Sequence, residues 1–166
     1  MKATIFVSAL LLFCAGCTSQ QSEQLTQQQV DQIKSEVKLA GDSLMAKLRR
    51  LDPGWSLYFV ESPDWKMINA DGSHNDYQTF ANSTNNFNTS VATYNWATTR
   101  QDFIVAAKDM VICSWIGKDE LTFKSGDKMT YDPHSYTLIF KKIDNQWKVF
   151  YSHDSGVPVM SKVGKK

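Results

Sequence analysis

Three histidines carry much of the chemistry available to this sequence, and His153 is the most informative of them. It lies in residues 147–155, where apolar and polar side chains alternate as in a β-strand. Side chains two apart share one face of a strand, so His153 is predicted on the face of Trp147 and Val149. On the pocket side, its imidazole could act as general acid or base. The alternative, which the sequence favours, is a structural histidine hydrogen-bonded to Ser155 or to a main-chain carbonyl.

The other two histidines do not combine with His153 into a recognisable ligand set. His74 follows the turn-forming pair Asp71-Gly72, and His134 follows Asp132-Pro133 at a predicted bulge. The histidines lack the i, i+4 or paired spacing of metal ligands. No glycine-rich phosphate loop or Gly-x-Ser-x-Gly elbow occurs either. We therefore expect neither a metal nor another cofactor.

Aromatic residues are abundant for a chain of this size, and pockets for flat or apolar ligands are often lined by such groups. Aromatics also fill cores and dimer faces, and for each residue taken singly the sequence favours that role. The predicted ligand-binding pocket is made of Tyr58, Trp96, Trp115, Tyr136 and His153.

The N-terminus is typical of an exported protein. Met1-Lys2 and the apolar run 3–15 form a secretion signal that is too short to span a bilayer. The run ends in Cys14-Ala15-Gly16-Cys17, which resembles the bacterial lipobox. This resemblance implies removal of residues 1–16, lipidation of Cys17 and a membrane anchor; Thr18 favours the periplasmic face of the outer membrane. The alternative is an ordinary signal cut near Ala15 or Gly16.

Charge and cysteine content agree with an exported, non-nucleic-acid-binding protein. The sequence has 18 Lys and Arg against 17 Asp and Glu, and the signal removes one lysine and no acid. A neutral chain offers no electrostatic field for nucleic acid. With Cys14 removed and Cys17 acylated, Cys113 is the only free thiol. Its apolar strand context favours a small buried side chain over a reactive nucleophile.

The folded part is predicted to start with a long helix. Residues 17–29 form a polar tether, and from Val30 to Leu51 apolar residues recur at steps of three and four. Thr26 and Gln29 fit a capping box, and Pro53-Gly54 ends the helix. Residues 55–60 and 65–70 are predicted as strands, and Asp76 as the cap of a second helix that runs to about residue 90.

The second half is predicted as an antiparallel meander. The apolar period changes to two in residues 91–107, 110–123, 127–142 and 146–154, and the short links between them require antiparallel neighbours. Long strands of this kind form a curved sheet, against which two amphipathic helices bury their apolar stripes. We predict an α+β cone over residues 30–158, with a basic tail at 159–166.

The chain resembles the NTF2-like superfamily, in its SnoaL-like branch of small bacterial domains. The resemblance rests on the long first helix, on residues 64–72 before the second helix, and on Gly126, residues 137–149 and 152–155 near the end. It implies an internal pocket and a homodimer through the outer face of the sheet. Ketosteroid isomerase in this superfamily has a carboxylate base, but Ser62 stands at that position and Glu61 points to the other face.

These observations favour a lipid-anchored binding module that holds a small apolar ligand or a partner protein. The alternative is a SnoaL-like isomerase, dehydratase or hydrolase that uses His153 for proton transfer, and a structural envelope protein is a third possibility. A pocket in which a histidine and a carboxylate converge would favour the enzyme.

Overall fold

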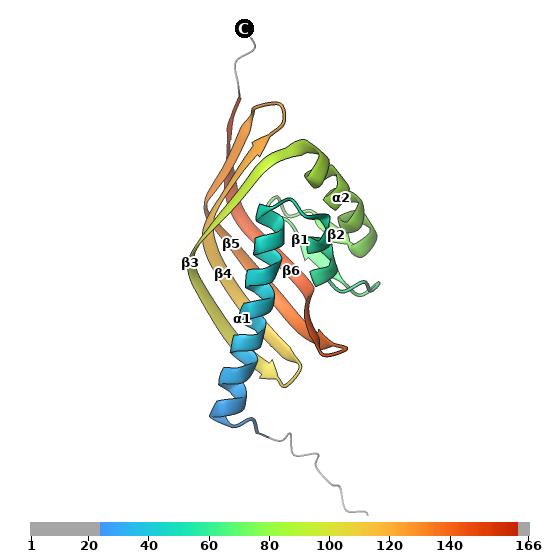
Figure 1. Ribbon diagram of the computed structural model, residues 1–166, viewed down its shortest axis with the longest axis vertical. Helices are drawn as coiled ribbons and strands as arrows, with labels where there is room; N and C mark the ends of the chain where they lie inside the picture. The colour runs from blue at the N-terminus through green and yellow to red at the C-terminus, as the bar shows by residue number, and fades with distance from the viewer. Residues whose placement is uncertain (1–23, 163–166) are drawn as a thin grey trace, which may run out of the picture.

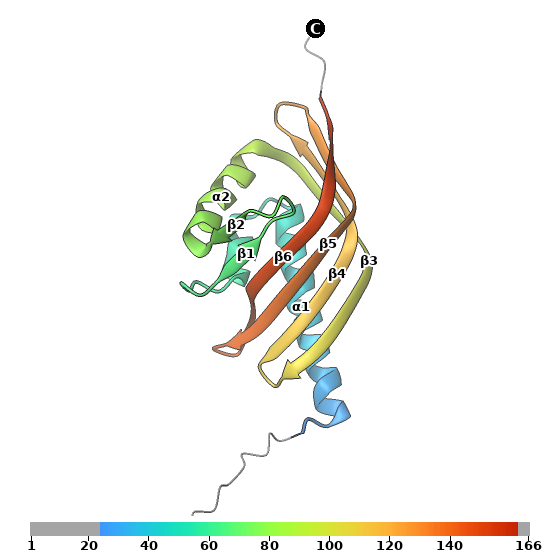
Figure 2. The ribbon, with the colours of Figure 1, turned by 180° about the vertical axis from the view of Figure 1, so that it is seen from behind.

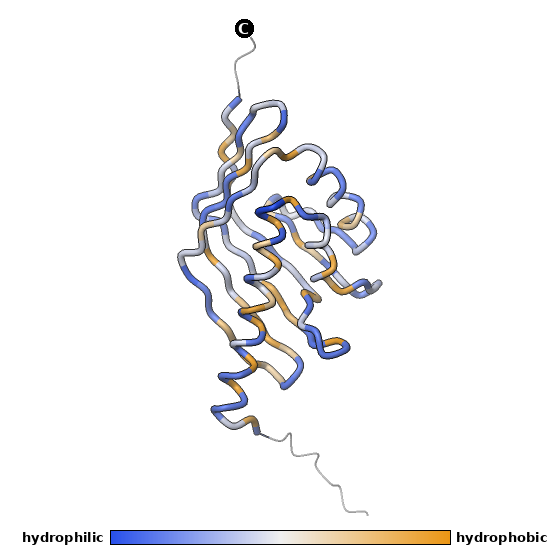
Figure 3. Tube along the Cα trace, viewed as in Figure 1, coloured by the Kyte–Doolittle hydropathy of each residue, from blue (hydrophilic) through white to orange (hydrophobic). Residues whose placement is uncertain are grey.

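A computed structural model describes residues 24–162 of the chain. Helix α1, Gln27–Arg49, begins at the predicted capping box, where the Thr26 hydroxyl accepts from the Gln29 amide and the Gln29 side chain accepts from the Thr26 amide. Its core-facing stripe is buried from Ile33 and Val37 to Leu44 and Met45. Figure 3 shows apolar positions recurring along α1 between hydrophilic ones. The predicted helix and its core-facing side are confirmed.

Residues 53–58 form a 3-10 helix, so the strand predicted over residues 55–60 is wrong. The Asp52 side chain accepts from the Gly54 amide at 2.8 Å, and Pro53 holds the first helical position. The aromatic content that indicated a strand serves burial instead, since Trp55 packs edge-on against Phe80 at a centroid distance of 5.5 Å.

The middle of the chain contains the strand predicted within residues 65–70 and the predicted second helix, and between them a short strand that was not predicted. Strands β1, Lys66–Ile68, and β2, His74–Asp76, pair antiparallel around a turn that contains Gly72 at φ +83°. Asp76 caps helix α2, Tyr77–Ser90, by accepting from the Thr79 amide at 2.8 Å.

The four long strands make the predicted antiparallel meander. They are β3, Val91–Ala107, β4, Met110–Phe123, β5, Lys128–Ile143, and β6, Gln146–Ser161. The complete order is β2-β1-β6-β5-β4-β3, and β1 joins β6 in parallel. The sheet curves around α1, and α2 lies at one end of the hollow (Figure 1). The predicted α+β cone is confirmed.

Bulges bend the long strands and reset which side chains face inward, and three of their register shifts bear on the site. Register shifts occur at Thr98/Arg100 in β3, between Tyr131 and His134 in β5, and at Phe150 in β6. Each inserts one residue, so the alternation of faces changes beyond it. The bulge predicted at Asp132-Pro133 is confirmed.

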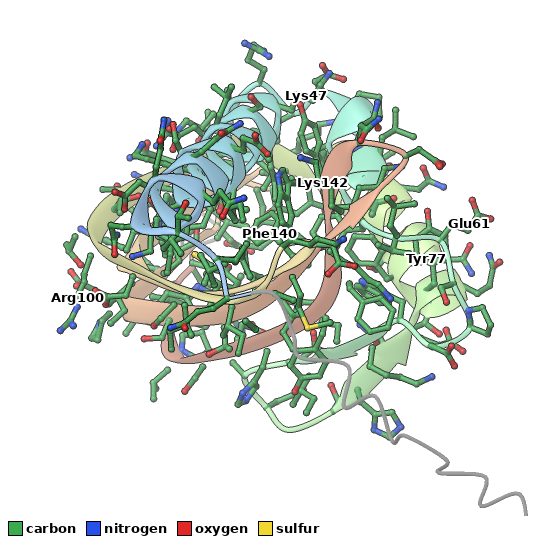
Figure 4. The ribbon with its side chains drawn as sticks, turned by 90° about the horizontal axis from the view of Figure 1, so that it is seen from below. Lys47, Glu61, Tyr77, Arg100, Phe140 and Lys142 are labelled. Carbon is green, nitrogen blue, oxygen red and sulfur yellow. The ribbon has the colours of Figure 1, made fainter. Side chains whose placement is uncertain are left out.

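Polar contacts fix α1 against the β5–β6 hairpin. Glu36 Oε2 accepts from Lys142 Nζ at 2.8 Å and from Trp147 Nε1 at 2.9 Å. The hydrogen bond from Lys142, followed by that from Trp147, lowers the pKa of Glu36 to about 2. In Figure 4, Lys142 lies between α1 and the hairpin, Phe140 lies inside the curve and Arg100 lies outside it.

The folded body is slightly longer than predicted at both ends. Residues 27–29 of the predicted tether belong to α1, and residues 159–161 of the predicted tail belong to β6. The predicted signal peptide and Cys17 lie outside the described residues. Within residues 24–162, no helix is both long and apolar enough to cross a bilayer. Cys113 is fully buried, as predicted, and burial raises its thiol pKa to about 12.

Candidate active site

A cavity of about 380 Å³ lies between α1, α2 and the concave face of the sheet. Most of its wall is apolar, and polar side chains gather where β4, β5 and β6 run side by side. Pockets of this size and composition hold small molecules. The polar and aromatic residues of this part of the wall are Tyr94, Trp115, Asp119, Tyr131, His134, Tyr136 and Asp154.

Strand register brings one histidine and two carboxylates together at this wall. His134 on β5 lies opposite Gly117 on β4 and Gly156 on β6. Asp119 and Asp154 stand two residues from those glycines on the same strands, so they share the inward face. A Cβ on Gly156 would lie 3.0 Å from His134 Cδ2, and the glycine therefore leaves room for the imidazole.

The three side chains form a buried acidic group around the imidazole. His134 Nδ1 lies 3.1 Å from Asp119 Oδ2, and its Nε2 lies 3.4 Å from Asp154 Oδ2. Tyr136 donates to the same Asp119 oxygen at 3.3 Å. Only 3% of His134, 3% of Asp119 and 9% of Asp154 is exposed. The electrostatic interactions among these groups are therefore screened little by bulk water and are stronger than on the surface.

The pKa of His134 is raised by its carboxylate neighbours. Burial alone lowers this pKa, but the contacts with Asp119 and then Asp154 outweigh it. Protonated imidazole is therefore favoured more than in water. The pKa values of Tyr94 and Tyr136 are raised well above the ordinary value, mainly by burial and then by neighbouring charges that include Asp119. Both phenols remain protonated and act as hydrogen-bond donors.

The β5 bulge places a further aromatic ring against the imidazole. Tyr131 and His134 are three residues apart, yet the bulge puts them on one face, where their rings stack at 4.2 Å and 13°. The Tyr136 ring lies 4.4 Å from His134 on centroids, and the Trp96 ring lies 6.3 Å away. This packing restricts the imidazole to one orientation, which proton transfer in a fixed geometry requires.

The structure brings together only part of the predicted pocket. Trp115 and Tyr136 line the cavity, and Trp96 packs behind them, 5.3 Å from the Tyr136 ring. Trp96 and Trp115 both donate to the Thr98 hydroxyl, at 2.8 and 2.9 Å. Tyr58 lies in a separate groove beside α1.

His153 is exposed and does not line the cavity, so its predicted face is wrong. The cause is the bulge in β6: Phe140 pairs with Val149, but Ile139 pairs with Tyr151, which leaves Phe150 as an extra residue. Trp147 and Val149 point inward as predicted. Beyond the bulge the faces exchange, and Asp154 points inward in place of His153.

Asp119 and Asp154 were not predicted as site residues, because an acidic residue in a strand normally faces the solvent. The available signals were the glycine two residues from each carboxylate and the bulge before His134. Among residues 24–162, no group of three or more His, Cys, Asp or Glu side chains has an arrangement that could hold a metal ion. The imidazole and carboxylates instead pair with one another.

Comparison of the fold identifies the class of protein. The chain has the fold of the NTF2-like superfamily. A proposed scytalone dehydratase from Novosphingobium aromaticivorans superposes with a TM-score of 0.72 at 9% identity, covering 85% of this chain and 94% of that one. An NTF2-like superfamily protein from Salmonella enterica gives 0.67 at 15% identity, with 81% and 96% covered. A proposed NTF2-like dehydratase from Streptomyces avermitilis gives 0.66 at 14%, with 76% and 97% covered.

The family follows from the sequence itself. Residues 64–162 match the model of the family described as "Protein of unknown function (DUF3804)". The chain belongs to this family. A comparison with curated proteins gave no match. The matched region contains all three members of the buried Asp119–His134–Asp154 group.

Proposed function

We propose that this protein is a lyase or isomerase that moves a proton on a small, largely apolar molecule held in the cavity. One observation carries the proposal: a buried histidine with a raised pKa lies between two carboxylates in the wall of an apolar pocket. Titratable groups perturbed in this way cluster at catalytic sites. The dehydratases among the superposed structures agree with this reaction class.

Loss of water from a hydroxylated substrate illustrates the chemistry. Asp119 takes a proton from carbon, and the electron pair of the broken C–H bond forms the new double bond. Protonated His134 donates its proton to the departing hydroxyl, which leaves as water. The proton that Asp119 took from carbon then leaves to solvent, and His134 Nε2 takes up another proton, which restores the starting state; Nδ1 remains hydrogen-bonded to Asp119. The Tyr136 hydroxyl orients Asp119 throughout.

The test is turnover by a His134→Gln variant. A panel of cyclic ketones and β-hydroxy ketones is incubated with the protein in deuterated water and followed by NMR. We expect the wild type either to eliminate water from some panel members or to exchange their carbon-bound hydrogen for deuterium. His134→Gln should lower the rate at least about 100-fold, because general acid–base catalysis is lost. His153→Gln is the matched control, since His153 is exposed and outside the cavity.

Two results of this experiment would contradict the enzyme proposal. Full turnover by His134→Gln would exclude His134 as the proton-transfer group. A wild-type protein that binds panel members in the cavity but turns none of them over would favour the non-catalytic binding module that the sequence predicted.

We also propose that Cys17 is lipidated and anchors the protein to the envelope, on the periplasmic face of the outer membrane. The support is Cys14-Ala15-Gly16-Cys17 after the apolar run. Labelled palmitate should be incorporated into the wild type and into Cys14→Ser, because residue 14 is removed with the signal, and should be absent from Cys17→Ser. Label that persists in Cys17→Ser would refute the anchor.

The convex face of the sheet supports a homodimer as a further proposal. No described helix covers this face of β3–β6 (Figure 2). Ile104, Ile112 and Ile139 lie opposite one another on successive strands, and Ile104 is 64% exposed. An apolar row of this kind suits burial against a second copy.

A further inference from the structure

We infer that the cavity recognises a protonated amine on an aromatic or alicyclic body, with Asp154 as the partner of the ammonium group. The inference rests on the proposed function, because it names the substrate class of the same cavity. It assigns different tasks to the two carboxylates: Asp119 and His134 move the proton, and Asp154 holds the cationic end of the ligand.

The charged groups of the cavity wall favour a cationic ligand. Among residues 24–162, two carboxylates and one imidazole line it, and no lysine or arginine does. One imidazole cannot pair fully with two carboxyl groups, so even a protonated His134 leaves one of them without a cationic partner in the cavity wall. A buried charge without a partner is costly, and a ligand that carries one positive charge removes the cost. An anionic ligand would increase it.

The hydrogen bonding of Asp154 leaves room for a donor from the ligand. Asp119 accepts from Tyr136 and pairs with His134 at 3.1 Å, whereas Asp154 has only a 3.4 Å ion pair without hydrogen-bond alignment. The Oδ1 atoms of both carboxylates are buried and unpartnered among the described residues, but only Asp154 also lacks a hydrogen bond at Oδ2. Buried carboxylate oxygens normally have donors. An ammonium group supplies three of them around one compact charge.

The rest of the cavity fits the body of such a ligand. Tyr131 and Tyr136 place their rings against the His134 imidazole, which lies between the two carboxylates, and Trp115 continues the aromatic wall. Aromatic faces attract cations, and they do so more strongly where water is excluded. On the side of α1, Leu44 and Leu48 provide the apolar surface that a hydrocarbon ring requires.

Three indole probes that share a ring and differ in the charge of the side chain test the inference. Tryptamine carries an ammonium, tryptophol a hydroxyl and indole-3-acetate a carboxylate at neutral pH. Isothermal titration calorimetry on the wild type should give tryptamine a Kd at least about tenfold below that of tryptophol, and indole-3-acetate the weakest binding. In Asp154→Asn, tryptamine should lose its advantage over tryptophol.

Asp102→Asn is the matched control, because Asp102 is an exposed acid on the opposite face and pairs with Arg100. It should keep the preference for tryptamine. Equal Kd values for tryptamine and tryptophol in the wild type would overturn the amine assignment and leave the proton-transfer proposal standing. A preference for tryptamine that survives Asp154→Asn would overturn the role of Asp154. No binding by any of the three probes would also overturn the inference. Failure of the proposed reaction is detected separately, as unchanged turnover in His134→Gln.

Discussion

Gly117→Ala is expected to lower the free energy of unfolding by about 3 kcal/mol, a large effect for the addition of one methyl group. A Cβ at Gly117 would lie 2.4 Å from the Ala97 carbonyl oxygen and 2.6 Å from Trp96 Cζ2. The carbonyl belongs to the neighbouring strand, so it cannot move without disturbing the β3–β4 ladder. Urea denaturation measures the loss, and thermal melting should fall by roughly 10 °C.

Gly72→Ala is the control for Gly117→Ala. Gly72 has φ +83° and nothing within 4 Å of an added Cβ, so alanine should cost only about 1 kcal/mol of backbone strain. A loss at Gly117 no greater than that at Gly72 would show that the sheet yields easily to the methyl group. The Trp96 ring, and with it the wall behind Tyr136 and His134, would then not be fixed as described.

The architecture could be predicted because each element has a local cause in the sequence. The Thr26–Gln29 capping box and the Asp76 cap mark helix starts, and the change of period after Ser90 marks the strands. These signals require no knowledge of distant contacts. The exception, residues 55–60, combines strong aromatic content with an Asp-Pro-Gly start, and the cap at Asp52 decided the local conformation.

The site could not be predicted from alternation, because alternation holds only between bulges. One extra residue at Phe150 exchanged His153 for Asp154 at the cavity wall. At Asp132-Pro133 an extra residue had a different effect: it placed Tyr131 and His134, which are three residues apart, on the same face of β5. Such insertions are set by pairing with the neighbouring strands, so the residues of β6 alone do not reveal them.

Strand pairing also explains why a site of three residues far apart in sequence was overlooked. Asp119, His134 and Asp154 lie on three successive strands. The residues that pair with His134 on the two outer strands are glycines, which do not suggest a catalytic site in the sequence. In the sequence, each carboxylate taken alone has the properties of a surface residue. Only the register, combined with the concave curvature, makes them converge in an apolar cavity.

Asp119→Asn is expected to lower the pKa of His134 and to destabilise the protein by about 3 kcal/mol, because it breaks a buried charge pair. Burial works against protonation of His134, and Asp119 is the strongest influence in the opposite direction. NMR titration of the imidazole measures the first effect, and urea denaturation at several pH values measures the second. Asp102→Asn, an exposed acid, should change stability by less than about 0.5 kcal/mol.

The pH dependence gives the sign of this coupling independently. Because the folded-state pKa of His134 is raised, its protonation stabilises the fold. This contribution is complete below the unfolded-state pKa of about 6.5 and is lost as pH rises through the folded-state pKa. In Asp119→Asn the loss should move to lower pH. A His134 titration curve that is the same in both proteins would mean that Asp119 does not stabilise the protonated imidazole, and that the role of His134 as the acid in the proposed reaction has no basis.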